Sequence, residues 1–325
     1  MTTAVFAYLG TELVGVTVGE AANPRRVIPR AIKLTFYRIL LFYVVLVFLL
    51  GMLVPYNSKD LADGIKFGGN TAAASPFVIA IRIAGIRHLP GILNAAVLIF
   101  VFSAANSDLY IASRTLYGLA KEGKAPKIFK KTDARGVPIY ALGMSSAFCL
   151  LAYLVVTTSS YKVFGYFTAM VTIFGLLTWI AILITHISFV RARHAQGVTN
   201  DQIAYVAPLG MWGSVGALIF CILIALFRGF PTLAWKATAK PGTPFDYSTF
   251  ITTYLGIPVF IILFLGYKIF FKTSWLKPEE ADLFTGKDKI DREEAEYIAQ
   301  QQAQRNGKDE TVAEKWYRRT IGQLF

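Results

Sequence analysis

The stretch LTFYRILLFYVVLVFLLGMLV, residues 34–54, decides the fold class of this chain. It contains one charged residue, Arg38, and as a helix it is long enough to cross a bilayer core of about 30 Å. Further long apolar runs follow, and 55% of the 325 residues are hydrophobic. A soluble protein of this length would have to bury every run. We therefore expect a membrane protein with helical spans, since a helix pairs its own backbone groups.

The apolar runs predict an all-α, polytopic transmembrane helix bundle of about seven spans at residues 1–271, followed by a tail at 272–325. The predicted spans are 3–18, 34–54, 91–112, 138–158, 164–189, 209–229 and 248–271. The stretch Ser75–Gly85 is too short to span and predicts a short helix over the outer mouth, with a plain interfacial linker as the alternative. Glu293–Arg305 predicts a solvated, partly helical tail segment.

The charge distribution predicts the orientation of the spans. The net charge is +13, and residues 1–267 hold 22 Lys and Arg but only 9 Asp and Glu, whereas the tail from Lys268 is balanced. Alternate loops place 25 basic residues on one side of the predicted membrane and 8 on the other. The positive-inside rule then predicts a cytoplasmic tail. An excess spread over membrane loops, including Arg25 and Arg26, argues against nucleic-acid binding.

The chain carries no pattern typical of an enzyme or a metal site. Cys149 and Cys221 lie inside apolar runs, and His88, His186 and His194 are widely separated. The phosphate-loop, zinc-protease helix and nucleophile-elbow patterns are missing from the sequence. We expect no cofactor, no metal and no enzymatic reaction.

The first predicted span contains the triplet Gly10-Thr11-Glu12 between apolar residues. A carboxyl group at mid-membrane depth costs about 2.5–3.5 kcal/mol, so such groups usually face a bundle interior or an aqueous cavity. Gly10 lowers the helix preference by about 1 kcal/mol relative to alanine. Together they predict a helix broken at Gly10–Glu12, as at the substrate sites of many transporters. Two alternatives stay open: Glu12 bonds a neighbouring helix structurally, or the span is shifted and Glu12 is interfacial.

Two later spans also carry polar side chains at helical spacing. Ser103 and Asn106 lie three apart in the third span, and Thr168 and Thr172 lie four apart in the fifth, with Gly175 following. Hydrogen bonds between helices and close packing at small residues are the usual roles of such groups. Lining of a transport path is the alternative.

Several long runs resemble fungal amino-acid permeases of the amino acid–polyamine–organocation superfamily. FAYLGTELVGVTVGEAANPRRVIPRAIK (6–33) resembles the family's sixth span and the loop after it. The eighth span and its cytoplasmic loop are resembled by FSAANSDLYIASRTLYGLAKEGKAPKIF (102–129) together with RGVPIYAL (135–142). The end of the tenth span is resembled by TWIAILITHISFVRAR (178–193). The tail run DLFTGKDKID (282–291) is also similar to the family.

The resemblance implies a fold of twelve spans: two five-span inverted repeats, as in LeuT-like transporters, and two further helices. This chain then corresponds to the second repeat plus the two C-terminal helices, and we expect the first five spans to be missing. The glycine-rich broken first helix that cups the substrate carboxylate in the family is expected to be missing with them. Whether the chain transports alone is therefore open, and association with a complementary permease half or an oligomer is expected.

The resemblance also implies roles for the candidate residues. Backbone groups of Phe6, Ala7, Tyr8 and Gly10 would face the substrate's α-amino end, and Phe6 or Tyr8 would act as a gate or else pack against lipid. Thr11 would bond the substrate or its own backbone, and Glu12 would carry the coupled proton. The remaining candidates are Thr168 and Thr172 for substrate, and Ser103 and Asn106 for gating or coupling.

The expected function is secondary active, proton-coupled symport of amino acids by alternating access in a fungal plasma membrane. The partners are then an amino acid, a proton and the lipid bilayer, and no nucleic acid. The alternative from another class is a membrane nutrient sensor or scaffold that does not transport.

Overall fold

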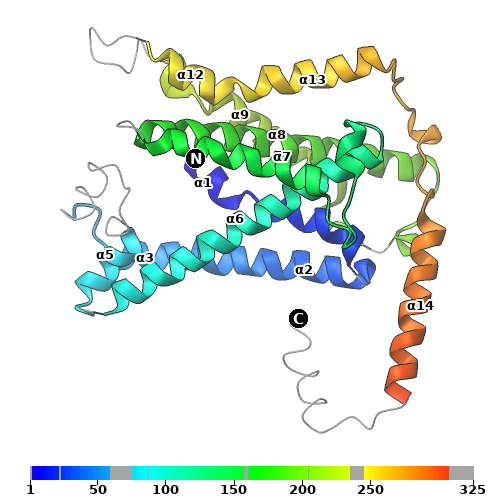
Figure 1. Cartoon of the computed structure of the whole chain (residues 1–325), viewed down its shortest axis with the longest axis horizontal. Coiled ribbons are helices and arrows are strands. Elements are labelled where there is room, and N and C mark those ends of the chain that lie inside the picture. The colour runs from blue at the N-terminus through cyan, green and yellow to red at the C-terminus, as the bar shows by residue number, and fades with distance from the viewer. Residues whose placement is uncertain are drawn as a thin grey trace. The chain divides into compact units, whose positions relative to one another are not determined.

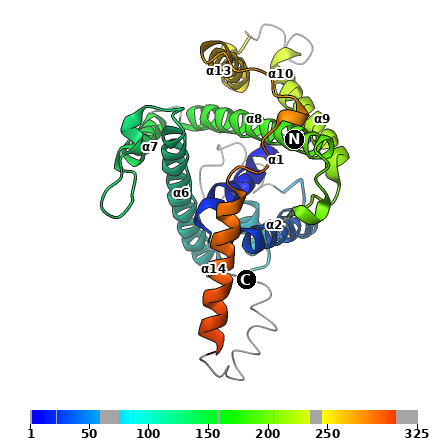
Figure 2. The ribbon, with the colours of Figure 1, turned by 90° about the vertical axis from the view of Figure 1, so that its right-hand side faces the viewer.

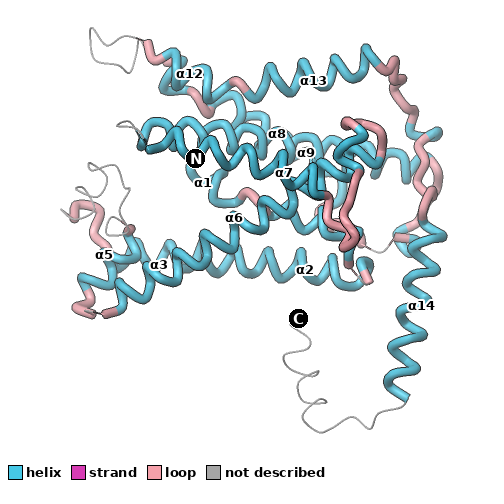
Figure 3. The backbone as a smooth tube through the Cα atoms, viewed as in Figure 1, coloured by secondary structure: helices cyan, strands magenta, loops and turns pink. Residues whose placement is uncertain are grey.

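The computed structural model describes residues 2–21, 23–58, 75–86, 88–156, 160–203, 205–234 and 245–306. Within these ranges every regular element is a helix, as Figure 3 shows. This confirms the predicted all-α class. The chain divides into two compact units, residues 35–165 and residues 1–34 together with 166–325. Each unit is described by itself.

Membrane-length helices account for five of the seven predicted spans. Four helices among the described residues are long and apolar enough to cross a membrane: Pro24–Leu53, Leu89–Lys121, Lys162–Ala195 and Gly210–Phe227. Tyr247–Tyr254 and Gly256–Phe270 count as a fifth if this pair, bent by 40°, is one span. The first and fourth predicted spans coincide with shorter apolar helices, Ala4–Val18 and Ile139–Leu154. The class of polytopic membrane bundle is thus confirmed, and the number seven stays a prediction.

The unit of residues 1–34 and 166–325 contains both chain ends and most of α8. Its elements are α1 (Thr2–Tyr8), η1 (Thr11–Glu20), the start of α2 (Pro24–Ile39), α8 (Ser160–Ala195), η6 (Asn200–Gln202), α9 (Gly210–Phe227), α10 (Phe230–Leu233), α12 (Tyr247–Tyr254), α13 (Gly256–Phe270), η7 (Pro278–Glu280) and α14 (Lys287–Asn306). α1 lies beside α8 and α9 in both views of Figures 1 and 2.

The core of this unit joins α1, α8 and α9. Val5 from α1 packs with Ile173 and Leu176 of α8 and with Cys221 and Ala225 of α9. Ile173 and Leu176 are fully buried. The burial of these side chains positions the first helix against the middle of α8, where the candidate site lies.

The α9–α12 connection in the same unit is fixed by one tyrosine. The Tyr254 hydroxyl donates to the Leu226 carbonyl at 2.7 Å and accepts from the Gly229 N–H at 3.2 Å. A Cβ at Gly229 would come within 2.8 Å of the Tyr254 hydroxyl oxygen, so this contact depends on glycine. The turn after α9 is therefore closed by a side chain from α12.

The unit of residues 35–165 is built around α6. Its elements are η2 (Leu40–Val45), α3 (Leu46–Leu53), α5 (Pro76–Ile83), α6 (Leu89–Lys121), η4 (Lys127–Lys130), α7 (Ile139–Cys149) and η5 (Leu150–Val156). α6 packs against α5, α7 and η4 (Figure 1). α5 confirms the short helix predicted within Ser75–Gly85, and its Val78 and Ile79 are buried. Its placement over an outer mouth stays a prediction.

The tail helix begins earlier than its sequence suggests. α14 starts at Lys287, whereas the helix was predicted from Glu293. Asp282 accepts hydrogen bonds from the backbone N–H groups of Phe284 and Thr285, at 3.0 and 2.9 Å. This Asx-type turn orients the chain just before the first helical turn, a role that short acidic side chains often take.

Candidate functional site

The break in the first apolar segment lies at Gly10, as predicted. α1 ends at Tyr8, Gly10 has φ 99° in the left-handed region, and η1 follows from Thr11 as a tighter 3₁₀ helix. Glycine adopts this conformation readily because it has no Cβ. The segment is therefore two short helices with a reoriented backbone between them.

Glu12 is held at this break by two N–H donors. Its Oε2 atom accepts from the indole Nε1 of Trp179 at 2.9 Å and from the backbone N–H of Gly10 at 3.1 Å. Among the described residues Oε1 has no hydrogen-bond partner, and no cation pairs with the carboxyl group. Both groups can only donate, so Oε2 accepts from each, while the acceptor capacity of Oε1 is unused among the described residues. Glu12 is thus hydrogen-bonded to a neighbouring helix, as one of the two alternatives expected. Its second carboxyl oxygen, Oε1, makes no hydrogen bond among the described residues.

Close packing of α1 on α8 places Glu12 beside Trp179. Gly175 lies where a Cβ would collide with the side chain of Leu9, one residue before the break. A small residue at this position lets the two helices approach, as small residues do in membrane bundles. Of the two roles considered for Thr168, Thr172 and Gly175, the structure supports close helix packing at Gly175.

The predicted substrate residues divide into two groups. Phe6, Ala7, Tyr8 and Thr11 flank the break, where Phe6 and Ala7 are exposed and Tyr8 and Thr11 are half-buried. The other group, Thr168 and Thr172, lies on α8.

Thr172 is only 1% exposed, and its hydroxyl donates to the Thr168 carbonyl at 2.5 Å. The hydroxyl of Thr172 is therefore satisfied inside its own helix. A role for either threonine in substrate binding stays a prediction.

Ser103 and Asn106 belong to the other unit, on α6. Both side chains are exposed, and the Ser103 carbonyl accepts from the Ser107 hydroxyl at 3.0 Å. They belong to a different compact unit from Glu12.

Two polar contacts on α8 escaped the sequence interpretation. The sequence shows Trp179 in the run 178–193 but does not indicate that Glu12 is its partner. The only available signal is the indole itself, because a buried indole N–H usually donates to an acceptor. His186 pairs through Nδ1 with the Ser214 hydroxyl at 2.7 Å, which links α8 to α9. Within the described part of the chain no group of His, Cys, Asp and Glu could hold a metal ion.

A second polar cluster, which we call the tail clasp, consists of Arg25, Asp291 and Glu294. The Arg25 guanidinium at the start of α2 pairs with Asp291 and, at 2.9 Å, with Glu294, both on α14. The hydrogen bond to Asp291 raises the pKa of Arg25 above its ordinary value; burial opposes this shift, and Glu294 adds to it. The predicted solvated tail segment is thus anchored at one face.

The linker that leads into α14 is held as well. The Gln196 side-chain amide, just after α8, donates to the carbonyls of Pro278 and Ala281 at 3.0 and 2.6 Å. Together with the tail clasp, this fixes α14 relative to the ends of α2 and α8. The polar cluster was not predicted, because ion pairs between residues so distant in sequence leave no local pattern.

The fold and the Glu12 site define a class: an integral membrane protein made of helices, with a broken apolar segment that holds a carboxyl group. Residues 1–279 match the family model for amino acid permeases, and the chain belongs to this family. Amino-acid permeases are membrane transporters rather than enzymes. This confirms the resemblance noted from the sequence.

The relatives of this chain are named for different amino acids. The chain is 50% identical over 99% of its length to the dicarboxylic amino acid permease of Saccharomyces cerevisiae, covering 52% of that protein. It is 39% identical over 86% of its length to a proline-specific permease of Emericella nidulans, covering 50% of it. It is 41% identical over 87% of its length to a lysine-specific permease of Lactococcus lactis, covering 53% of it. The chain thus spans about half the length of these relatives. No solved structure matches it.

Proposed function

We propose that this chain carries one half of the site of a secondary active amino-acid transporter, which works by proton-coupled symport and alternating access. In this proposal the seven predicted segments are spans six to twelve of the family's twelve. The protein would lie in the plasma membrane with its tail in the cytoplasm, and the loop charges support the cytoplasmic side of the tail.

The observation that carries the proposal is the geometry of Glu12 at the Gly10 break. A carboxyl group held through one oxygen by Trp179 and Gly10 can gain a proton on the other oxygen without losing either hydrogen bond. A group that changes charge while its position is maintained suits proton coupling. The backbone turn at Gly10 would offer its neighbouring polar groups to the substrate's α-amino end, as broken helices do in transporters.

Acidic amino acids are the first substrates to test. The relative with 50% identity is a dicarboxylic amino acid permease, and the match covers 99% of this chain. The lysine and proline permeases match at lower identity, so lysine and proline serve as competing substrates.

The test is uptake of radiolabelled L-glutamate by yeast cells that lack their own permeases. One strain expresses this chain alone, and another expresses it fused behind the N-terminal half of the yeast dicarboxylic amino acid permease. Surface amounts are matched by a C-terminal tag. We expect concentrative uptake by the fusion and little by the chain alone, because half of the proposed site is supplied by the added spans.

Other outcomes separate the alternatives. Robust uptake by the chain alone contradicts the need for a first repeat. A fusion that reaches the surface and binds glutamate without transporting it favours the nutrient-sensor alternative. A fusion that neither binds nor transports any of the three amino acids overturns the proposed function.

A further inference from the structure

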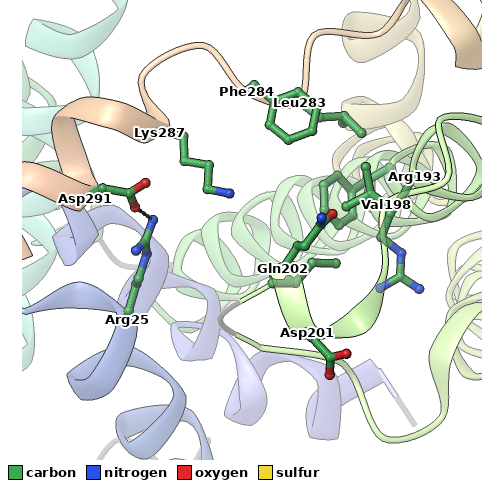
Figure 4. A pocket seen from close by; sticks show the side chains of 11 residues that line it. Arg25, Arg193, Val198, Asp201, Gln202, Leu283, Phe284, Lys287 and Asp291 are labelled. Carbon is green, nitrogen blue, oxygen red and sulfur yellow. Dashed lines mark hydrogen bonds and ion pairs between the residues drawn. The ribbon is translucent and has the colours of Figure 1, made fainter.

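A pocket of about 600 Å³ lies where the end of α8, the loop with η6 and the start of α14 meet. Figure 4 shows Lys287 and Gln202 reaching toward the middle of this space, with Asp201 on another wall. All of its lining residues belong to one compact unit. Its volume falls in the range of about 300–1,000 Å³ typical of small-molecule sites.

Arg193 is a buried cation in the wall of this pocket. It lines the pocket and is only 8% exposed. Its guanidinium donates to the Asn200 side-chain oxygen at 2.8 Å, but Nε is buried without a hydrogen bond. No carboxylate of the described residues pairs with it. An arginine cannot release its charge, and buried charges in proteins are normally paired. The geometry therefore favours an anion at this position.

A second cation from another element lines the same pocket. Lys287, the first residue of α14, lies 5.7 Å from the centre of the Phe284 ring and has no ion pair among the described residues. Gln202 adds an amide that can donate. Two cations and an amide from three separate segments thus line one pocket, and donors of this kind are the ones that oxyanions select.

The acidic side chains of the pocket do not cancel this charge. Asp291 is paired with Arg25 in the tail clasp, and Arg25 also pairs with Glu294, which does not line the pocket. Asp201 remains without an ion pair in the described structure and opposes an anion. The lining holds three cations (Arg25, Arg193 and Lys287) and two carboxylates (Asp201 and Asp291), a difference of +1, so substitution of Asp201 should change the affinity for an anion.

We propose that this pocket binds a phosphate-type anion, either the headgroup of an anionic phospholipid or a free phosphate compound. Arg193 and Lys287 supply the charge, and Gln202 supplies a neutral donor. Every surrounding segment belongs to the loops and tail that the charge distribution assigns to the cytoplasm. This inference is independent of transport activity, since it concerns binding at the tail side only.

The experiment uses the purified full chain and has two arms at constant ionic strength. In the first, inorganic phosphate and inositol trisphosphate are titrated in detergent against chloride, and binding is measured by calorimetry. In the second, the chain is placed in phosphatidylcholine nanodiscs with or without phosphatidylinositol bisphosphate, and bound lipid is measured by native mass spectrometry. Binding in the first arm alone identifies a free phosphate, and binding of the lipid identifies a headgroup.

Matched variants locate the site. Lys287→Gln should weaken binding by about tenfold, the order of one lost charged hydrogen bond. Lys289→Gln removes the same charge from the same helix outside the pocket, where Lys289 pairs with Glu293 at 3.6 Å, and should leave binding within about twofold.

Two further variants change the pocket's charge in opposite directions. Arg193→Gln should also weaken binding, and Asp201→Asn should strengthen it by removing a like charge. Equal effects of Lys287→Gln and Lys289→Gln, or no binding in either arm, would overturn the proposal.

Discussion

Two carboxylate sites in the same unit are held in opposite ways. Glu12 lies in an apolar segment and is fixed by the neutral N–H donors of Trp179 and Gly10. Asp291 and Glu294 lie on the tail helix and are fixed by the charged guanidinium of Arg25. Neutral donors position a carboxyl group without compensating its charge, whereas an arginine does both. The first site therefore holds a carboxyl group without a paired cation, and the second is an ion-paired cluster.

The surroundings of the two sites add to this difference. The proposed function places Glu12 at mid-membrane depth, where a charged group costs about 2.5–3.5 kcal/mol, and there it would be sensitive to any change in its donors. The side chains of the tail clasp are 31%, 43% and 24% exposed for Arg25, Asp291 and Glu294. Solvent therefore screens the clasp, and each pair contributes only about 0.2–1 kcal/mol.

The largest expected effect is that of Glu12→Gln in the permease fusion. Glutamine keeps the size and an acceptor for Trp179 but cannot carry a proton. Uphill uptake of glutamate should be lost. The pH dependence of the uptake rate should be lost as well; one proton-binding step can change that rate by up to about tenfold per pH unit. The measurement is initial uptake between pH 4.5 and 7.5 at matched surface expression. An unchanged pH profile would contradict the coupling role of Glu12.

Trp179→Phe should have the next largest effect. Phenylalanine keeps an aromatic ring against α1 but removes the indole donor, which leaves Oε2 of Glu12 with the Gly10 N–H alone. The loss of a hydrogen bond to a charged group is worth about 1.5–3 kcal/mol, so uptake should fall by tenfold or more and its pH profile should change.

The control for Trp179→Phe is Trp212→Phe, because Trp212 is 80% exposed and distant in sequence from the break. It should leave both uptake and pH profile near those of the parent. If the two variants lower uptake equally with unchanged pH profiles, Trp179 acts through packing and not through Glu12.

A smaller effect is expected when the tail clasp is reversed by Arg25→Glu. Repulsion from Asp291 and Glu294 should release the tail helix and raise its rate of proteolysis by about fivefold, as a change near 1 kcal/mol implies. Arg26→Glu serves as the control, since no ion pair of Arg26 is found among the described residues. Adding Asp291→Lys and Glu294→Lys to Arg25→Glu should restore protection, and failure of that rescue would argue against a charge-based contact.

The sequence predicted the site that depends on local signals and missed the one that depends on distant contacts. Gly10 and Glu12 are two residues apart, so a weak helix former and a costly carboxyl group together indicated the break. The Trp179 donor is 167 positions from Glu12, and the Arg25 clasp spans more than 260. No periodicity connects such residues, because their contacts depend on how η1 packs on α8 and how the start of α2 meets α14. The start of α2 at Pro24 has a local reason, since proline is well accommodated in a first helical turn.

The smallest expected effect concerns the turn before α14. The hydrogen bonds from the Thr285 side chain and backbone N–H and from the Phe284 N–H hold the pKa of Asp282 below its ordinary value, against a small opposing effect of desolvation. A carboxyl group whose pKa is lowered by folding stabilises the fold above its ordinary pKa and loses that contribution as the pH falls through the lowered value. The turn should therefore be intact at neutral pH and loosen only in strong acid. Asp282→Ala should lower the amide hydrogen-exchange protection of Phe284 and Thr285 at pH 7, while Asp282→Asn, which keeps an acceptor, should lower it less. Equal loss in both variants would mean that the charge, and not the acceptor, holds the turn, which would bring this site closer to the tail clasp than to Glu12.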